Sequence, residues 1–398
     1  MKKILFVMNT MGRAGAETAL LELLRRIDRS EYDISLFVLT GQGELINSLP
    51  MGVKLLNRYS DTTSVHSREG RKHLFVSGLK VLLKRFNFVR LLPYFAVNAT
   101  EMIKKRNLQI EKLLWRAFSD GAERSETKYD LAVSYIEGAA AYYVADHVMA
   151  DKKAAFIHVD YKKSGYTRNL DKDCYLKFDR IFGVSKEVTD VFLNVYPELA
   201  GKTEVFHNLI DAEGIRRKAD SGIGFTDDFS GIRLLTVGRL MAQKSFETSI
   251  KACYILKKHG ENIRWYVLGE GDRREKLQAL IEKLGLERDF ILCGAVDNPY
   301  PYMKEADIYV HCSRFEGKSI AVQEAQVLGK PIIVSDCSGN REQVIPDEDG
   351  VICEFDPRSI AKSIYELIHD ENKRDKISKN ALVKNNGEEE ALSRLLEI

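Results

Sequence analysis

ILFVMNTMGRAG, residues 4–15, opens the chain with an unbroken apolar run that passes into a polar loop with two glycines. A helical pattern follows over residues 16–27, and a second apolar run occupies residues 34–39. Apolar runs that do not alternate with polar residues, and that are separated by helices, are typical of parallel strands covered on both faces. The sequence therefore predicts an α/β domain that starts with a strand, a glycine-bearing loop and a helix.

The same rhythm continues along the chain and restarts once. Strand patterns of the first run follow at residues 130–133, 154–158, 180–184 and 203–206, and those of the second at 233–237, 264–268, 290–293, 308–311 and 331–334. Two such runs predict two doubly wound α/β domains, residues 1–207 and 232–398. Residues 208–231 are polar and glycine-bearing, so we expect a linker there. The last helix of the chain can pack on the N-terminal domain in this arrangement.

Composition narrows the functional classes. The 398 residues are 44% apolar and 30% charged with a net charge of +2, which argues against a disordered chain and against a protein that coats nucleic acid. Six scattered cysteines without a C-x-x-C pair predict reduced thiols, with neither a disulfide framework nor a zinc site. We find no signal peptide and no stretch of 18 apolar residues, so we expect a cytoplasmic protein.

Residues 68–116 depart from the α/β rhythm. They hold 12 Lys and Arg and 3 Asp and Glu, a net charge of +9, which leaves about −7 for the rest of the chain. Apolar residues recur at spacings of four and three and predict an amphipathic helix that ends at Pro93. These apolar residues are Phe75, Leu79, Leu82, Phe86 and Val89. A basic amphipathic helix can lie on an anionic membrane surface, whereas the alternative is that its apolar stripe packs on the N-terminal domain.

Two loops that follow strands carry features of an anion site. In the loop before the first helix, Gly12 and Gly15 allow close approach of a ligand to the backbone, although a plain glycine turn explains them equally. After the strand at 233–237, Arg239 and Lys244 stand just before a helix. Cations are unfavourable at the positive end of a helix dipole, so two of them there favour a diphosphate site over chance surface charge.

Two further loops carry glycines and carboxylates. Gly269-Glu270-Gly271 lacks the third glycine of a dinucleotide fingerprint and favours a close-approach turn. In SRFEGKSIAVQEA, residues 313–325, Glu316 lies in a loop and Glu324 in an otherwise apolar helix. A carboxylate among buried neighbours is costly unless it is paired or meets a ligand, and it can accept hydrogen bonds from two vicinal hydroxyls of a ribose or sugar. The spacing of the two Glu residues, taken alone, can also be a coincidence.

Together these motifs resemble the family 4 retaining glycosyltransferases of the GT-B fold, also called glycosyl transferases group 1. The resemblance is dense over about residues 230–370 and looser in the N-terminal half. It rests there on Gly12–Glu17, Phe156–Asp160 and Val184-Ser185. In the C-terminal half it rests on Val237–Leu240 with Lys244, Leu268–Gly271, Asn298–Met303, the Glu316 and Glu324 pair, and Leu328–Pro331.

The resemblance implies roles for individual residues. Arg239 and Lys244 would neutralise the donor diphosphate, Glu324 would hold the ribose, and Glu316 would hold the donor sugar. His158 would lie near the donor sugar, although a lone His is more often structural. The implied catalytic set is Arg239, Lys244, Glu316 and His158. The implied donor-binding set is Gly12, Gly15, Gly238, Arg239, Lys244, Gly271, Glu316, Gly317, Lys318, Ser319, Ile320 and Glu324, and the implied acceptor residues are Asp160 and Lys162.

The family also implies a reaction. A hexose or N-acetylhexosamine would pass, with retention, from a UDP-sugar or similar donor to a glycan or lipid-linked acceptor of cell-surface polysaccharide or teichoic-acid type. No metal or other cofactor is expected, because Arg239 and Lys244 supply the positive charge. The expected partners include an anionic membrane surface contacted by residues 68–116, at the inner face of the plasma membrane, and no nucleic acid. The alternatives are a degenerate homologue that acts as a binding subunit and an NAD(P)-linked oxidoreductase.

Overall fold

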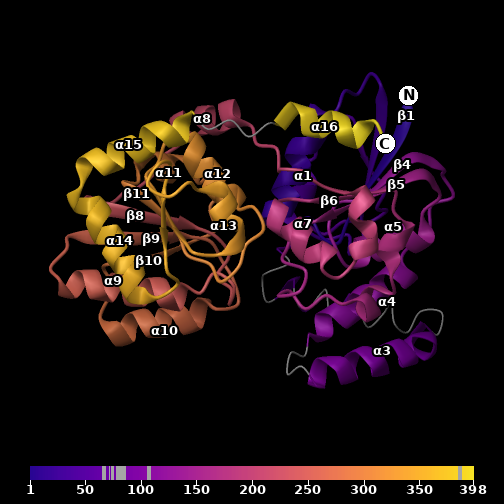
Figure 1. Cartoon of the computed structure of the whole chain (residues 1–398), viewed down its shortest axis with the longest axis horizontal. Coiled ribbons are helices and arrows are strands. Elements are labelled where there is room, and N and C mark those ends of the chain that lie inside the picture. Colours follow the sequence, from indigo (N-terminus) through magenta and orange to yellow (C-terminus); the bar gives the residue numbers. More distant parts are fainter. Residues whose placement is uncertain (65–68, 71, 73–75, 78–86, 105–108, 384–387) are drawn as a thin grey trace. The chain divides into compact units, whose positions relative to one another are not determined.

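The computed structural model describes the chain except for residues 65–68, 71, 73–75, 78–86, 105–108 and 384–387. The chain forms two compact units (Figure 1). Unit 1 comprises residues 1–209 and the C-terminal helix α16 (Glu388–Leu396), and unit 2 comprises the residues between them, from Ile210 onward. Each unit is a parallel sheet packed with helices, so the prediction of two doubly wound α/β domains is confirmed.

The sheet of unit 1 has seven parallel strands in the order β3-β2-β1-β4-β5-β6-β7. They are β1 (Lys2–Met8), β2 (Tyr32–Val38), β3 (Val53–Leu55), β4 (Tyr129–Ser134), β5 (Ala150–Ile157), β6 (Arg180–Gly183) and β7 (Thr203–Val205). Strand β1 pairs with β2 on one side and with β4 on the other, for example Phe6 with Leu36 and with Val133. The strand order therefore reverses between β1 and β4, and ligands bind at such a point in open α/β sheets.

Helices of unit 1 pack against this sheet or against one another. The helices of the unit are α1 (Gly15–Arg26), α3 (Asn87–Lys104), α4 (Ile110–Gly121), α5 (Ala139–His147), α6 (Arg168–Asp171), α7 (Lys186–Leu193) and α16, with short 3-10 turns η1 (Glu44–Ser48), η3 (Cys174–Lys177) and η4 (Pro197–Lys202). Helices α5 and α7 pack against the sheet, whereas α3 packs on α4. Helix α5 is buried along nearly its whole length, which its Ala-rich sequence permits. In α16, Arg394 lies 3.6 Å from Glu204 of unit 1.

The segment 68–116 is only partly described. Of the predicted amphipathic stripe, Phe75, Leu79, Leu82 and Phe86 lie outside the described residues. The prediction that a helix ends at Pro93 is wrong, because α3 runs through this proline. The proline removes one backbone hydrogen bond, but Leu91, Tyr94, Asn98 and Met102 bury the face of α3 that carries them, and this packing outweighs the loss.

Unit 2 has a six-stranded parallel sheet in the order β10-β9-β8-β11-β12-β13. Its strands are β8 (Ile232–Val237), β9 (Ile263–Leu268), β10 (Phe290–Gly294), β11 (Ile308–His311), β12 (Ile332–Ser335) and β13 (Val351–Cys353). The order reverses between β8 and β11, where Leu234 pairs with Ile308 and Leu235 with Tyr309. A buried hydrogen-bond chain crosses this pair, because Trp265 donates to Thr236 and Thr236 donates to the carbonyl of Val310.

The helices of unit 2 are α8 (Ala212–Asp220), α9 (Phe246–Lys258), α10 (Arg274–Leu284), α11 (Tyr300–Glu305), α12 (Ile320–Val327), α13 (Ser338–Gln343), α14 (Pro357–His369) and α15 (Glu371–Leu382). The linker predicted over residues 208–231 is wrong for α8. Asp211 caps this helix by accepting from the N–H of Gly214, and Ile215 and Ala219 are buried. The polar composition of this stretch hid a short amphipathic helix that packs in unit 2 against α11 and α12.

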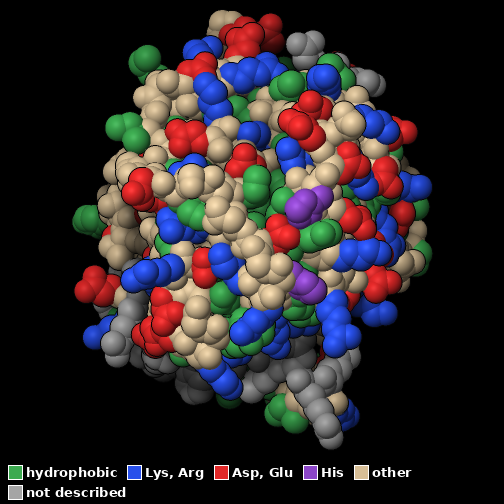
Figure 2. Space-filling model, turned by 90° about the vertical axis from the view of Figure 1, so that its left-hand side faces the viewer, with side chains coloured by type: hydrophobic (Ala, Val, Ile, Leu, Met, Phe, Trp, Pro, Cys, Tyr) green, Lys and Arg blue, Asp and Glu red, His purple; other side chains and the backbone are tan. Residues whose placement is uncertain are grey.

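Three general features complete the fold. Across the described ranges, no helix is both long and apolar enough to span a bilayer. All six cysteines are described, none of them forms a disulfide, and five are buried. Figure 2 shows Lys and Arg side chains interspersed with Asp and Glu over one face of the molecule, which is the local counterpart of the near-neutral total charge.

Candidate functional site

In unit 2, two loops meet at the carboxyl ends of β8 and β11. Residues 238–245 follow β8, and residues 312–319 follow β11. The side-chain amide of Gln243 donates to the carbonyl of Phe315 at 2.7 Å, and the N–H of Arg314 donates to the carbonyl of Gln243 at 2.9 Å. These bonds join the loops directly, so the side chains that follow Gln243 and Phe315 lie next to one another.

Lys244 and Glu316 form the centre of this site. The Lys244 ammonium lies 2.5 Å from Glu316 Oε1 and 3.0 Å from His311 Nε2. The same ring nitrogen lies 3.2 Å from Glu316 Oε1 and 3.3 Å from the hydroxyl of Ser319. We call these four residues, Lys244, His311, Glu316 and Ser319, the switch-point cluster.

The electrostatics of the switch-point cluster follow from its burial. Burial alone would oppose ionisation of Glu316, but the Lys244 ammonium outweighs it and holds the pKa of that carboxyl well below its usual range. Burial, with the nearby Lys244 charge, lowers the pKa of His311. The cluster therefore contains one cation, one anion and one neutral imidazole.

The backbone beside Lys244 is unusual. Ser245 has a left-handed conformation (φ 45°, ψ 48°), which is rare for a residue other than glycine. It is buried at the start of α9, and its hydroxyl lies 3.3 Å from that of Thr248. Left-handed residues of this kind concentrate at functional sites. Arg239, the second predicted cation, is half-buried in the same loop after β8.

The glycines of this loop region are required by backbone contacts. A Cβ atom at Gly271 would lie 2.3 Å from the carbonyl oxygen of Leu240, and one at Gly269 would lie 2.0 Å from that of Gly238. Gly269 also has a φ of 152°. At Gly238 itself a Cβ would meet only Lys244 at an ordinary 3.5 Å. The close-approach reading of Gly269-Glu270-Gly271 thus has a structural reason within unit 2.

Hydrogen bonds from a residue of α13 fix the start of α12. The side chain of Gln343 accepts from the N–H of Ser319 at 2.7 Å and donates to its carbonyl at 2.8 Å. Gly317 is buried, and a Cβ at Gly339 would lie 1.4 Å from its carbonyl oxygen. This packing fixes the loop that leads through Lys318 and Ser319 to Ile320, the first residue of α12.

Glu324, on α12, is a nearly buried carboxylate. Tyr300 donates its hydroxyl to Glu324 Oε1 at 2.8 Å. Burial raises the pKa of Glu324 to about 7, although the Tyr300 hydrogen bond and Lys218 act against this shift. A buried carboxyl with so little compensation is typical of a functional position. Glu324 lies outside the switch-point cluster.

In unit 1, the loop after β1 contains Gly12 and Gly15. Gly15 is the first residue of α1, and Glu17 in the first turn accepts from the Thr10 hydroxyl at 3.3 Å. The loop rests on residue 43, where a Cβ would lie 2.1 Å from the carbonyl carbon of Met11. The structure therefore places both glycines at the N-terminus of a helix, as the sequence predicts.

A polar group lies at the carboxyl ends of β1, β4 and β5. Asn9 donates to the carbonyl of Glu137 at 2.9 Å and accepts from the N–H of Ala140 at 2.8 Å. The Glu137 carboxylate accepts from the N–H of His158 at 3.0 Å. Burial raises the pKa of Glu137 and lowers that of His158 to about 4. Asn9, Glu137 and His158 thus meet where the strand order of unit 1 reverses.

The two predicted acceptor residues differ in their surroundings. Asp160 is buried and caps a turn, because it accepts from the N–H of Lys163 at 2.9 Å and its other oxygen lies 3.2 Å from the Lys163 ammonium. Lys162 is exposed. Local capping is sufficient to explain Asp160, and any role in acceptor binding stays a prediction for both residues.

Some of the predicted residues come together, and others were missed. Lys244, Glu316 and Ser319 form one cluster in unit 2, whereas His158 lies in unit 1. Sequence reasoning missed His311 and Glu137; the signal was a polar residue at the end of each buried strand pattern. Among the described residues, no group of three or more His, Cys, Asp or Glu side chains is arranged to hold a metal ion.

Comparison with known proteins identifies unit 2. Residues 230–383 match the family model described as "Glycosyl transferases group 1". Unit 2 belongs to this family. The glycosyltransferase unit contains the switch-point cluster and Glu324, so these residues lie inside the matched region.

A curated relative gives the same result. The chain is 33% identical over 202 residues to the N-acetylgalactosamine-N,N'-diacetylbacillosaminyl-diphospho-undecaprenol 4-alpha-N-acetylgalactosaminyltransferase of Campylobacter jejuni, which covers 50% of this chain and 53% of that protein. The chain thus spans about half the length of the curated relatives it matches most clearly.

Solved structures extend the likeness of fold to the whole chain. HepE of Anabaena, in complex with UDP and glucose, matches with a TM-score of 0.70 at 16% identity over 100% of this chain and 99% of that one. TarM of Staphylococcus aureus, in complex with fondaparinux, alpha-GlcNAc-glycerol and UDP, matches with a TM-score of 0.68 at 12% identity over the same shares. At these identities the likeness shows the fold, which is GT-B.

The raised pKa of Glu324 predicts a pH-dependent stability. The folded chain keeps this proton up to about pH 7, whereas the unfolded chain releases it near the ordinary value of 4.5. The free energy of unfolding therefore falls as pH rises through this window, by about 3 kcal/mol in total. Glu324→Gln cannot ionise, so its stability relative to wild type should increase by this amount between pH 4.5 and 8.

Urea unfolding in a Trp115→Phe background measures this difference, because Trp265 then reports on unit 2 alone. The expected result is that the free energy of unfolding of Glu324→Gln, relative to that of the protein with Glu324, increases with pH. A difference that is constant from pH 4.5 to 8 would contradict the assigned shift.

Proposed function

We propose that this chain is a retaining glycosyltransferase that moves a hexose or N-acetylhexosamine from a UDP-sugar to a glycan or lipid-linked acceptor in cell-surface glycan assembly. The single observation that carries the proposal is the switch-point cluster, which presents a lysine and a carboxylate at the reversal point of a doubly wound sheet. The relatives support the class of reaction, since one is named for N-acetylgalactosaminyl transfer to an undecaprenol-linked substrate and two structural neighbours hold UDP.

The diphosphate of the donor would be held by Arg239 and Lys244. Both cations belong to one loop, residues 238–245, immediately before α9. The helix N-terminus adds free backbone N–H groups to their charges, and a diphosphate needs both. Lys244 is already desolvated, with about 16% of its side chain exposed, so its interaction with a phosphate would be weakly screened.

The two carboxylates would recognise hydroxyl groups. Glu324 is buried and has Tyr300 as a hydrogen-bond donor at one oxygen, which leaves capacity to accept from the vicinal hydroxyls of a ribose. Glu316 would accept from hydroxyls of the donor sugar, with the backbone of Gly317 to Ile320 around it. In this assignment Glu316 is ionised by its Lys244 contact before the donor arrives.

The chemistry would run without a metal ion, because positively charged side chains can stabilise the negative charge that develops on the leaving phosphate. The phosphate oxygen that leaves would lie on the same face as the attacking hydroxyl and could take its proton. The new bond would then form on the face where the old one breaks, which gives retention. His158 would stay neutral over the physiological range, since its pKa lies near 4, and would act as a hydrogen-bonding group near the sugar.

The first prediction from the proposed function concerns the donor nucleotide and the stereochemistry of transfer. In a thermal-shift assay with UDP, GDP, ADP and NAD, UDP should raise the Tm of the protein the most. With the matching α-linked UDP-sugar, NMR of the product anomeric proton should show an α linkage, at a rate unchanged by EDTA. A β product, or strict Mg²⁺ or Mn²⁺ dependence, would contradict the mechanism; stabilisation by NAD alone would favour the oxidoreductase alternative. UDP binding without any transfer would favour the binding-subunit alternative.

The second prediction concerns the donor site. Glu324→Ala should reduce donor use roughly 10- to 100-fold, since a hydrogen bond to a charged group is worth about 1.5–3 kcal/mol. Arg239→Ala with Lys244→Ala should cost more, because these cations act on charge that develops in the transition state. The matched control is Lys251→Ala with Lys258→Ala, which removes two exposed cations from α9. Equal kcat/KM in the two double variants would overturn the site assignment.

An anionic membrane surface is proposed as the place where a lipid-linked acceptor is met. Residues 68–116 carry a net charge of +9, although Lys112 and Arg116 are buried in unit 1 and do not contribute to its surface. On α3, Leu92, Val97 and Ile103 are 49%, 56% and 64% exposed. At helical spacing Leu92 and Ile103 share one side of α3, whereas Val97 lies well around the helix from them. Exposed apolar side chains of this kind, in a segment whose sequence carries excess positive charge, fit the surface of an anionic bilayer.

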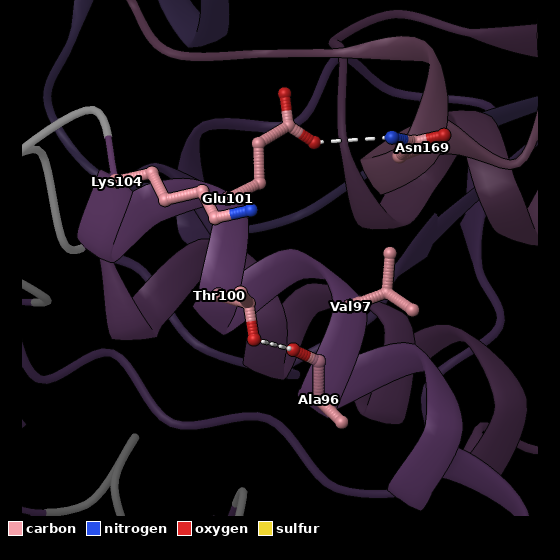
Figure 3. A pocket seen from close by; sticks show the side chains of 6 residues that line it. All are labelled: Ala96, Val97, Thr100, Glu101, Lys104 and Asn169. Atoms are coloured by element: carbon pink, nitrogen blue, oxygen red, sulfur yellow. Dashed lines mark hydrogen bonds between the residues drawn. The ribbon is translucent and has the colours of Figure 1, made fainter.

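The exposed side of α3 is also hollowed. A surface hollow of about 530 Å³ is lined by Val97, Thr100 and Glu101 of α3 among others. Figure 3 shows these side chains, with Asn169 donating a hydrogen bond of 3.1 Å to Glu101. Lys104, at the end of α3, also borders the hollow. Polar side chains thus lie beside the exposed apolar residues of α3. Such a mixture is what we expect at a surface that contacts lipid headgroups.

The third prediction is made for liposomes. Wild type should co-sediment with acidic but not neutral vesicles, and salt should weaken this binding. Leu92→Ser with Val97→Ser and Ile103→Ser should reduce it, as should Lys80, Lys84, Arg85 and Arg90 changed together to Ser. Ile223→Ser, at an even more exposed apolar residue of unit 2, is the control and should bind normally. Unchanged sedimentation of both multiple variants would remove the membrane proposal.

A further inference from the structure

His311 is the one member of the switch-point cluster whose role the proposed function leaves open. It is the last residue of β11 and is 1% exposed. Its Nε2 atom faces the Lys244 ammonium at 3.0 Å, the Ser319 hydroxyl at 3.3 Å and Glu316 Oε1 at 3.2 Å. A strand of this kind is otherwise apolar, as Ile308, Tyr309 and Val310 show, so an imidazole here has a specific cause.

The contacts of Nε2 favour one tautomer. The Lys244 ammonium can only donate, the Ser319 hydroxyl can donate or accept, and Glu316 Oε1 already receives a hydrogen bond from Lys244. An Nε2 atom without a proton accepts from Lys244, whereas an Nε2–H group could donate to Glu316 Oε1 but would leave the Lys244 ammonium, 3.0 Å away, without this acceptor. The ring proton then resides on Nδ1, which is buried and has no hydrogen-bond partner among the described residues.

We infer that His311 is a positioning residue: through Nε2 it holds the Lys244 ammonium in the direction from which that ammonium would meet the donor phosphates. This inference rests on the proposed function for the identity of the donor. Glu316 alone would orient Lys244 toward the sugar subsite and neutralise its charge. A neutral imidazole adds a second point of attachment without a second negative charge, so no further negative charge is placed beside the diphosphate.

The surroundings of His311 agree with a neutral ring. The charged groups that face it are Lys244, from the loop before α9, and Glu316, from the loop after β11. Tyr309, on the same strand, lies stacked at 6.2 Å between ring centroids and is itself kept protonated by burial. Burial and Lys244 together lower the pKa of His311, so the ring stays neutral through the range in which the enzyme would act.

The first experiment needs no donor. Protein labelled with ¹⁵N in its eight histidines is measured by long-range ¹H–¹⁵N NMR at pH 7, and the signal that disappears in His311→Gln is that of His311. The expected result is an Nδ1–H tautomer with an unprotonated Nε2, and a change of the Nε2 shift in Lys244→Met. An Nε2–H tautomer, or a shift that does not respond to Lys244→Met, would overturn the inference.

The second experiment measures kinetics with UDP-sugar. Glutamine places an amide oxygen close to the position of Nε2 and can accept from Lys244, whereas leucine cannot. His311→Leu should raise the donor KM about tenfold or more and leave the acceptor KM within twofold, and His311→Gln should restore the donor KM to within about threefold of wild type. His259→Leu, at an exposed histidine after α9, is the control and should behave as wild type.

The outcomes separate this inference from the proposed function. Equal donor KM values for His311→Leu and His311→Gln, or loss of thermal stability in His311→Leu with no change of donor KM, would overturn the positioning role. Failure of wild type to use any nucleotide-diphosphate sugar would overturn the proposed function instead, and the tautomer measurement would still decide whether His311 holds Lys244.

Discussion

The parallel pairing of β8 with β11 is the constraint on which the site of unit 2 depends. The register of Leu234 with Ile308 places the carboxyl ends of both strands at one edge of the sheet. The loop after each strand therefore begins at the same level, and Gln243 and Phe315 can join the two loops directly. Since 70 residues separate the end of β8 from the start of β11, this edge collects groups that the chain keeps far apart.

A balance of charge and burial governs the side chains at this edge. Lys244 and Glu316 pair with one another at 2.5 Å, which compensates the burial of the Glu316 carboxylate. Glu324 has only a neutral hydroxyl partner in Tyr300, so burial raises its pKa toward neutrality. One carboxylate is thus fixed as an anion and the other is left responsive to a ligand. Unit 1 repeats this pattern with Glu137, whose buried carboxylate accepts from the backbone N–H of His158.

The sequence was sufficient for the repeating parts of the fold because they depend on local periodicity. Unbroken apolar runs and helical spacings predicted all the longer parallel strands, and order along the chain separated the two units. Predictions from local sequence patterns failed where tertiary packing determines the structure. Helix α8 was taken for linker because its polar face dominates its composition, and α3 continues through Pro93 because its buried face compensates for one lost hydrogen bond. The strands β3 and β13, of three residues each, were not predicted, although the equally short β7 was.

By itself, the sequence determined which residue types stand in the loops after each strand: the glycines, Arg239 with Lys244, and the pair Glu316 and Glu324. Only the tertiary structure decided which of them touch. It brought Lys244 to Glu316, kept Glu324 apart beside Tyr300, and added His311, which no spacing in the chain connects with Lys244. The physical reason is that contact across a parallel sheet depends on strand order and register. These are fixed by packing over the whole domain, whereas periodicity reports only on which face of its own element a residue lies.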